Sequence, residues 1–154
     1  MQQFEASISW NRGQQPFLDQ RYSRAHRWQF DGGLHVLASS SPLSVPLPMS
    51  DAAAVDPEEA LVAALSGCHM LFFLSFAARC RFVVDSYRDQ AVGTMEKDAR
   101  GKMSMTRIAL RPVIAFSGER QPDSAALAAL HHEAHEHCYI ANSIRAQVTI
   151  EGGA

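Results

Sequence analysis

Cys68 and Cys138 are the residues of this sequence whose surroundings point most clearly to chemistry. Cys68 lies between Gly67 and His69 in a long apolar segment, where small neighbours leave space beside its sulfur. Cys138 directly follows the histidine-rich segment 131–137. A cysteine becomes a good nucleophile only as the thiolate, which needs a nearby positive charge or hydrogen-bond donors. For either residue the alternative is a buried cysteine that only packs.

The histidine-rich segment offers a second kind of chemistry. His131, His135 and Cys138 stand at positions i, i+4 and i+7, so on a helix they would share one face. That spacing suits a zinc or copper ion. A solvated or interface face of the helix is the alternative, and we predict neither a metal ligand nor a cofactor. A metal- or small-ligand-binding dimer that uses this helix is an alternative function.

The third cysteine, Cys80, stands between Arg79 and Arg81 at the predicted end of the long apolar segment. This position separates it from the segments around Cys68 and Cys138. We therefore expect Cys80 to be structural or incidentally exposed.

The long apolar segment carries strong signals for a helix over residues 57–79. Asp56 is a suitable N-cap, Pro57 suits the first helical position, and Glu59 can complete a capping box. Apolar residues are spread around most of the helix circumference, so it must be buried on nearly all sides. One small sheet cannot cover such a helix, and we therefore expect a homodimer. Polar residues interrupt the apolar run, which argues against a membrane span.

The remaining elements are predicted from alternating apolar residues and turn signals. A second helix should run from an N-cap at Asp123 to about His137, and Ser39–Ser50 should form a connecting loop. Strands are expected over residues 4–10, 22–30, 34–37, 82–95, 103–116 and 146–150. Strands grouped into antiparallel hairpins and separated by helices predict an α+β fold.

Length, composition and charge restrict the class of protein. The chain has 154 residues, of which 47% are hydrophobic and 19% charged, and its formal net charge is -2. These values favour a single globular domain over residues 1–154 and give no basic excess for binding nucleic acid. The first ten residues show no targeting signal, so we expect a cytoplasmic protein. Thiols there stay reduced unless they are catalytic or bind metal.

Two segments resemble motifs of the OsmC/Ohr family of hydroperoxide-reducing proteins. Residues 56–69 resemble the family's peroxidatic-cysteine motif, and residues 131–143 resemble its resolving-cysteine motif. The likeness extends over nearly the whole chain, including residues 84–93 and 106–112. It implies an OsmC-like fold, with antiparallel sheets wrapped around long central helices in an intertwined homodimer. It also implies that Cys68 attacks an organic hydroperoxide and that Cys138 then closes a transient disulfide with it.

The resemblance implies two further catalytic residues. The family's glutamate falls on Glu58, and its arginine falls in the first hairpin, where Arg24 is closest to the family position and the other candidates are Arg21 and Arg27. Arg24 would stabilise the thiolate, and Glu58 would hold Arg24 in an ion pair. Alternatively, Glu58 interacts only with the helix dipole, and Arg24 is a solvated strand residue.

Helix geometry restricts how Glu58 could serve Cys68. Ten helical residues advance about 15 Å, so Glu58 cannot act directly on the Cys68 of its own chain. An antiparallel helix from a second chain could bring the two residues together, which is a second reason to expect a dimer.

The resemblance also implies an external dithiol as the reductant, and in the family this is often a lipoylated protein. Two departures from the family pattern leave the natural peroxide and reductant open. Tyr139 follows the second cysteine where the best-known branches have proline, and His69 follows the first. Another thiol–disulfide activity on the same scaffold stays an alternative.

Overall fold

The computed structural model describes residues 1–152, which form two compact units. The first unit runs from Met1 to Ala60, and the second begins at Leu61. Helices and largely antiparallel sheets make up the fold, so the predicted α+β class is confirmed. The single domain stays a prediction.

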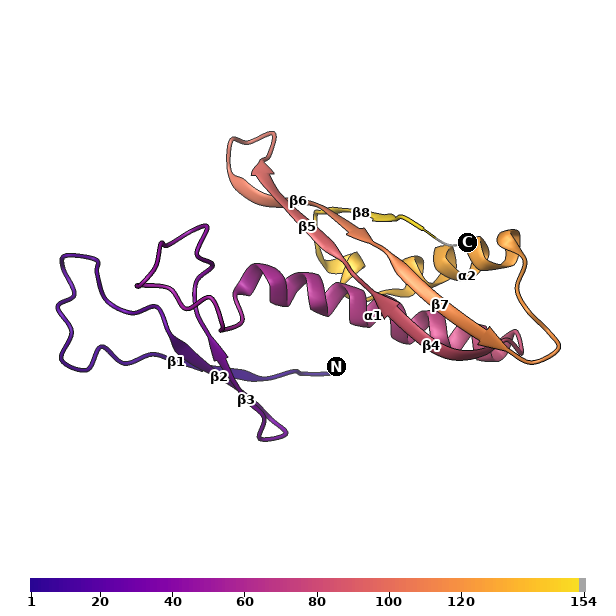
Figure 1. The fold of residues 1–154 in the computed structure, drawn as a ribbon, viewed down its shortest axis with the longest axis horizontal. Coiled ribbons are helices and arrows are strands. Elements are labelled where there is room, and N and C mark those ends of the chain that lie inside the picture. Colours follow the sequence, from indigo (N-terminus) through magenta and orange to yellow (C-terminus); the bar gives the residue numbers. More distant parts are fainter. Residues whose placement is uncertain (153–154) are drawn as a thin grey trace. The chain divides into compact units, whose positions relative to one another are not determined.

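The first unit contains a three-stranded antiparallel sheet (Figure 1). Its strands, in chain and spatial order, are β1 (Ala6–Ser9), β2 (His26–Phe30) and β3 (His35–Ala38). Gly33, at φ 87°, makes the turn between β2 and β3, and its amide donates to the Phe30 carbonyl at 2.9 Å. A positive φ favours glycine because glycine has no Cβ. The predicted hairpin is therefore confirmed.

Helix α1 spans Pro57–Arg79, as predicted. The backbone amide of Glu59 donates to the Asp56 carboxylate at 2.8 Å, and the Asp56 amide donates to the Glu59 carboxylate at 2.9 Å. These reciprocal bonds form the predicted capping box and satisfy two amides that the first helical turn leaves free. The local sequence therefore determines where the helix begins.

Four strands form a long, twisted hairpin in the second unit, and they correct the prediction of two continuous strands. They are β4 (Val83–Asp89), β5 (Val92–Lys97), β6 (Met103–Leu110) and β7 (Pro112–Ser117). β4 pairs with β7, and β5 pairs with β6. The interruption occurs where the Arg111 amide donates to the Asp89 carboxylate at 2.6 Å and where Pro112 has no amide hydrogen to donate.

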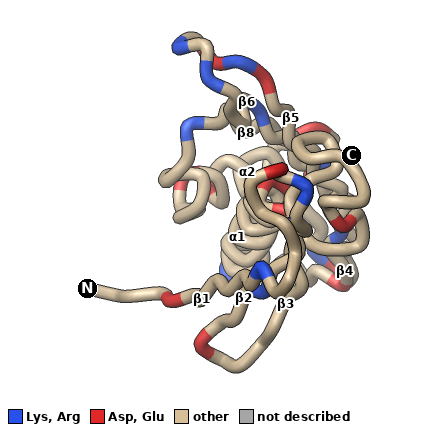
Figure 2. Tube along the Cα trace, turned by 90° about the vertical axis from the view of Figure 1, so that its left-hand side faces the viewer, with Lys and Arg blue, Asp and Glu red and all other residues tan. Residues whose placement is uncertain are grey.

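The tip of the hairpin forms a turn between β5 and β6. The Asp98 carboxylate accepts hydrogen bonds from the backbone amides of Arg100 and Lys102 and from the Arg100 guanidinium. These donors lower the pKa of Asp98, with the Arg100 side chain as the largest cause. Figure 2 shows that basic and acidic residues alternate around this tip.

Strand β8 (Gln147–Ile150) runs parallel to β6, whereas antiparallel pairing was expected throughout. Between β7 and β8 lie α2 (Ser124–His137) and a short 3-10 helix (Ala141–Ser143). A connection of this length can return the chain to pair in parallel, which a tight hairpin turn cannot do. Asp123 caps α2 as predicted, accepting a hydrogen bond from the Ala126 amide at 2.7 Å.

Helix α1 contributes to both hydrophobic clusters of the second unit. One cluster joins α1 to α2, with Phe73 and Leu130 among its members. The other joins α1 to β6 and the segment after α2, and it contains Leu65, Ile108 and Cys138. The two clusters bury one face of α1 and connect both helices to the sheets.

The opposite face of α1 stays accessible within a single chain. Leu71 is 64% exposed, and Ala64 and Ala78 are exposed as well. The predicted burial on nearly all sides relied on a second chain, so it stays a prediction. Among residues 1–152, α1 is also the one helix long and apolar enough to span a membrane. Core helices of soluble proteins share this length and apolar composition.

Gly93 on β5 lies in close contact with neighbouring side chains. A Cβ added there would be 2.6 Å from the Met105 sulfur and 2.7 Å from Val62 Cγ2. We expect Gly93→Ala to lower the free energy of unfolding by about 2 kcal/mol, because the packed side chains must shift. Gly32→Ala is the control, since its Cβ would meet nothing within 4 Å in the described structure. Equal urea-unfolding midpoints for the two variants would contradict this account.

Candidate active site

Cys68 and Cys138 are neighbours in the second unit, although 70 positions separate them in the sequence. Cys138 is fully buried, and the partly buried Cys68 packs against its cluster. All three cysteines are free thiols, and Cys80 is exposed. A small molecule from solvent can therefore reach Cys68 more easily than Cys138.

The thiol of Cys138 is held in a protonated state at neutral pH. Burial raises its pKa from 9.0 to about 11, and the neighbouring Cys68 adds to that increase. The Ala141 amide donates to the Cys138 sulfur at 3.4 Å and acts in the opposite direction. Because a thiolate is the attacking form of cysteine, Cys138 is a weak nucleophile toward molecules from solvent.

The helix turn around Cys68 combines open space with an acidic group. A Cβ on Gly67 would meet no atom of other described segments within 4 Å, so the helix surface is open at Gly67. Ser66 donates a short hydrogen bond to the Asp89 carboxylate, which also accepts the Arg111 amide. These bonds tie α1 to the point where β4 ends.

The apolar residues after Cys68 differ in what they contact. Phe72 packs against both clusters and meets the Tyr139 ring edge-on, with centroids 5.1 Å apart. Phe73 is 0% exposed and packs against His131. Of these two aromatic residues, only Phe72 belongs to the surroundings of the cysteine pair.

Arg24 and Glu58 belong to the first unit. The Arg24 guanidinium lies 3.7 Å above the Tyr22 ring centre and donates to the backbone carbonyls of Gln20 and Tyr22. Glu58 is half-buried, and its Oε2 has no hydrogen-bond partner within the described chain. Among residues 1–152 neither side chain takes part in an ion pair, so their pairing stays a prediction.

A pair of histidines was missed by the sequence analysis. His69 Nε2 and His131 Nδ1 share a hydrogen bond of 3.0 Å, and the two side chains are 1% and 5% exposed. Burial lowers the pKa of His69 to about 4 and also lowers that of His131. Both imidazoles are therefore neutral at pH 7. The sequence could not reveal this pair, because no pattern in it indicates which residue packs against His131.

The alternative of a metal site on α2 has no matching cluster of ligands in the described part of the chain. No group of three or more His, Cys, Asp or Glu side chains there could hold an ion. His131 instead bonds to His69, and Cys138 packs into an apolar cluster. The shared helical face thus serves packing in this structure.

The histidine pair predicts a decrease in stability in acid. The unfolded chain takes up a proton near pH 6.5, whereas folded His69 resists protonation until about pH 4. The free energy of unfolding should therefore fall as the pH is lowered from 6.5 to 4, by on the order of 3 kcal/mol. Urea unfolding at several pH values should show a smaller decrease for His69→Leu/His131→Leu. The control variant His132→Gln, changed at an exposed histidine, should show the same decrease as wild type. Equal decreases in wild type, the double variant and the control would contradict the assignment of the effect to the His69–His131 pair.

Residues 50–152 match the family model described as OsmC-like protein. The chain belongs to the OsmC-like family. An OsmC-like protein of unknown function from Vibrio cholerae is 52% identical, with 98% of this chain and 99% of that chain covered and a TM-score of 0.96. No curated protein matches the chain.

Two more distant structures share the fold of this OsmC-like protein. An organic hydroperoxide resistance protein from Elizabethkingia anophelis is 13% identical over 97% of this chain and 93% of that one, with a TM-score of 0.70. The organic hydroperoxide resistance protein OhrB of Bacillus subtilis is 17% identical over 97% and 96%, with a TM-score of 0.65. At these identities the likeness establishes the fold, and the predicted OsmC-like fold is confirmed.

Proposed function

We propose that this OsmC-like protein is a thiol peroxidase that reduces organic hydroperoxides to alcohols. The main support is the contrast between two neighbouring thiols, of which Cys68 is partly accessible and Cys138 is fully buried. This arrangement lets Cys68 meet the peroxide first. Distant relatives of the same fold are named organic hydroperoxide resistance proteins.

The proposed reaction begins with the Cys68 thiolate. It attacks the distal peroxide oxygen, the O–O bond breaks, and the leaving alkoxide takes a proton to become the alcohol. Cys68 is now a sulfenic acid. The Cys138 thiol condenses with it, which forms a disulfide and releases water. An external dithiol, for which we favour a lipoylated protein, then reduces the disulfide by thiol–disulfide exchange.

We further propose that the active enzyme is a cytoplasmic homodimer in which α1 packs against α1 of a second chain. The exposed apolar residues of α1, such as Leu71, support a helical partner. The buried, unpaired Oε2 that Glu58 has within the described chain supports a cationic partner, because a buried carboxylate is costly unless it is paired. Arg24 is our candidate for that cation and for the group that stabilises the Cys68 thiolate.

Among the hairpin arginines, Arg24 should be the one needed for activity. Arg24 is half-buried, whereas Arg21 and Arg27 are exposed. We expect Arg24→Met to lower kcat/KM for cumene hydroperoxide by about 100-fold, because a positioned charge near a reacting anion has effects of this size. Arg21→Met and Arg27→Met should stay within about threefold of wild type. A larger loss of kcat/KM in Arg21→Met or Arg27→Met would assign the catalytic role to that arginine instead of Arg24.

Steady-state turnover tests the proposed function itself. Purified protein is mixed with cumene hydroperoxide or hydrogen peroxide, and with dihydrolipoamide or a monothiol as reductant. We expect the organic peroxide and the dithiol to give the fastest turnover. The absence of turnover with every peroxide would exclude a peroxidase and favour another thiol–disulfide activity.

A further inference from the structure

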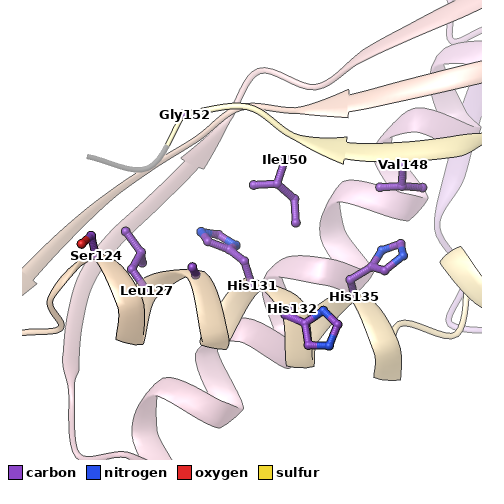
Figure 3. A pocket seen from close by; sticks show the side chains of 9 residues that line it. Ser124, Leu127, His131, His132, His135, Val148, Ile150 and Gly152 are labelled. Carbon is purple, nitrogen blue, oxygen red and sulfur yellow. The ribbon is translucent and has the colours of Figure 1, made fainter.

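A pocket of about 410 Å³ lies between α2 and β8 in the second unit. Its apolar wall consists of Leu127, Ala128, Val148 and Ile150. Figure 3 shows His131 and His135 on the side of α2 that faces these two strand residues. Neither Cys68 nor Cys138 lines the pocket, which is therefore separate from the proposed peroxide site. Its volume lies within the range of small-molecule sites.

His131 supplies the buried polar group of this pocket. Its side chain is 5% exposed, and its Nδ1 is held by the hydrogen bond to His69. Its second ring nitrogen, Nε2, is buried and has no hydrogen-bond partner among the described residues. A buried polar atom without a partner is unfavourable, so a ligand that bonds to Nε2 would gain affinity.

The state of the histidine pair restricts the chemistry of such a ligand. Both imidazoles are neutral at pH 7, since burial lowers the pKa of each. Depending on which histidine donates the shared hydrogen bond, Nε2 of His131 is either a donor or an acceptor. A hydroxyl group can bond to it in either case. A carboxylate would lose its hydration at this nitrogen without gaining an opposite charge.

We propose that the pocket between α2 and β8 binds a small, uncharged ligand with an apolar body and a hydroxyl group that bonds to His131 Nε2. The apolar body lies against Leu127, Val148 and Ile150. The hydroxyl enters between the wall and the ring of His131. The site is independent of the thiol chemistry and needs neither peroxide nor disulfide.

The test uses three probes of similar size, namely benzyl alcohol, toluene and benzoate, titrated into the reduced full-length protein without peroxide. NMR resonances of the histidine rings report binding at His131. We expect benzyl alcohol to bind about fivefold or more tightly than toluene, as one added neutral hydrogen bond allows. Benzoate should bind more weakly than benzyl alcohol.

Two neighbouring alanines of α2 provide matched variants. Ala128 lines the pocket, Ala129 does not, and both are exposed. Ala128→Trp should fill the pocket and weaken benzyl alcohol binding at least about tenfold, while Ala129→Trp should leave it within about twofold. His131→Phe should abolish the preference for the alcohol over toluene.

Four results would overturn the proposal. They are no probe-dependent shift at His131, tightest binding of benzoate, equal weakening by the two tryptophan variants, and stoichiometric Zn²⁺ binding that displaces benzyl alcohol. Because the protein is reduced and no peroxide is present, a failure of the ligand-binding test does not count against the proposed peroxidase. Likewise, a lack of peroxidase activity would not count against this ligand site.

Discussion

Cys68→Ser should lower kcat/KM for cumene hydroperoxide by at least about 1000-fold, because a serine hydroxyl is not ionised at neutral pH and is a poor nucleophile toward peroxide oxygen. The replacement is small, and Cys68 is only partly buried, so the fold should persist. A peroxide-consumption assay with a dithiol measures the loss. The urea-unfolding midpoint shows whether the variant is folded.

Cys80→Ser is the matched control for this variant. Cys80 is exposed and lies just after the end of α1, apart from the neighbouring pair. Its replacement should leave turnover within about twofold of wild type, as surface substitutions usually do. Full turnover by Cys68→Ser, or loss of turnover in Cys80→Ser alone, would overturn the assignment of the attacking cysteine.

Cys138→Ser should separate the first chemical step from the complete cycle. The variant should still consume about one equivalent of peroxide per chain, because Cys68 can form the sulfenic acid alone. Later turnover should be slower by about 100-fold, since no internal thiol remains to form the disulfide that the reductant recognises. Rapid mixing with cumene hydroperoxide measures the first equivalent, and steady-state assays measure the rest.

Chemical trapping completes the experiment on Cys138→Ser. Dimedone should label Cys68 in the oxidised variant and should label wild type far less, because there the sulfenic acid is consumed by Cys138. Wild-type rates of continued turnover in the variant would show that Cys138 does not resolve the intermediate. Label on Cys80 would show that the wrong thiol had been assigned.

Local signals explain which elements could be predicted from the sequence. Asp56 and Glu59 form the expected capping box, and Asp123 caps α2 as expected, because each contact joins residues three positions apart. The interruption of the long hairpin was not predicted, since it depends on the Arg111 amide bonding to Asp89, 22 positions earlier. The parallel pairing of β8 with β6 likewise depends on contacts between distant segments.

The candidate site shows the same division between local and distant contacts. Each cysteine motif could be predicted from its own residues, but the proximity of Cys68 and Cys138 follows from the packing of α1 against the end of α2. The His69–His131 bond joins residues 62 positions apart, and nothing in either segment indicates it. No ion pair joins Arg24 to Glu58 among residues 1–152, so this pairing stays a prediction.

The central claim is that Cys68 and Cys138 close a disulfide when the protein meets an organic hydroperoxide. Its most direct test is intact mass and peptide mapping under non-reducing conditions, after one equivalent of cumene hydroperoxide per chain. We predict the loss of two hydrogens per chain and a single crosslinked peptide that joins Cys68 to Cys138. A crosslink to Cys80, or sulfenic acid on Cys68 that persists with Cys138 present, would contradict the account.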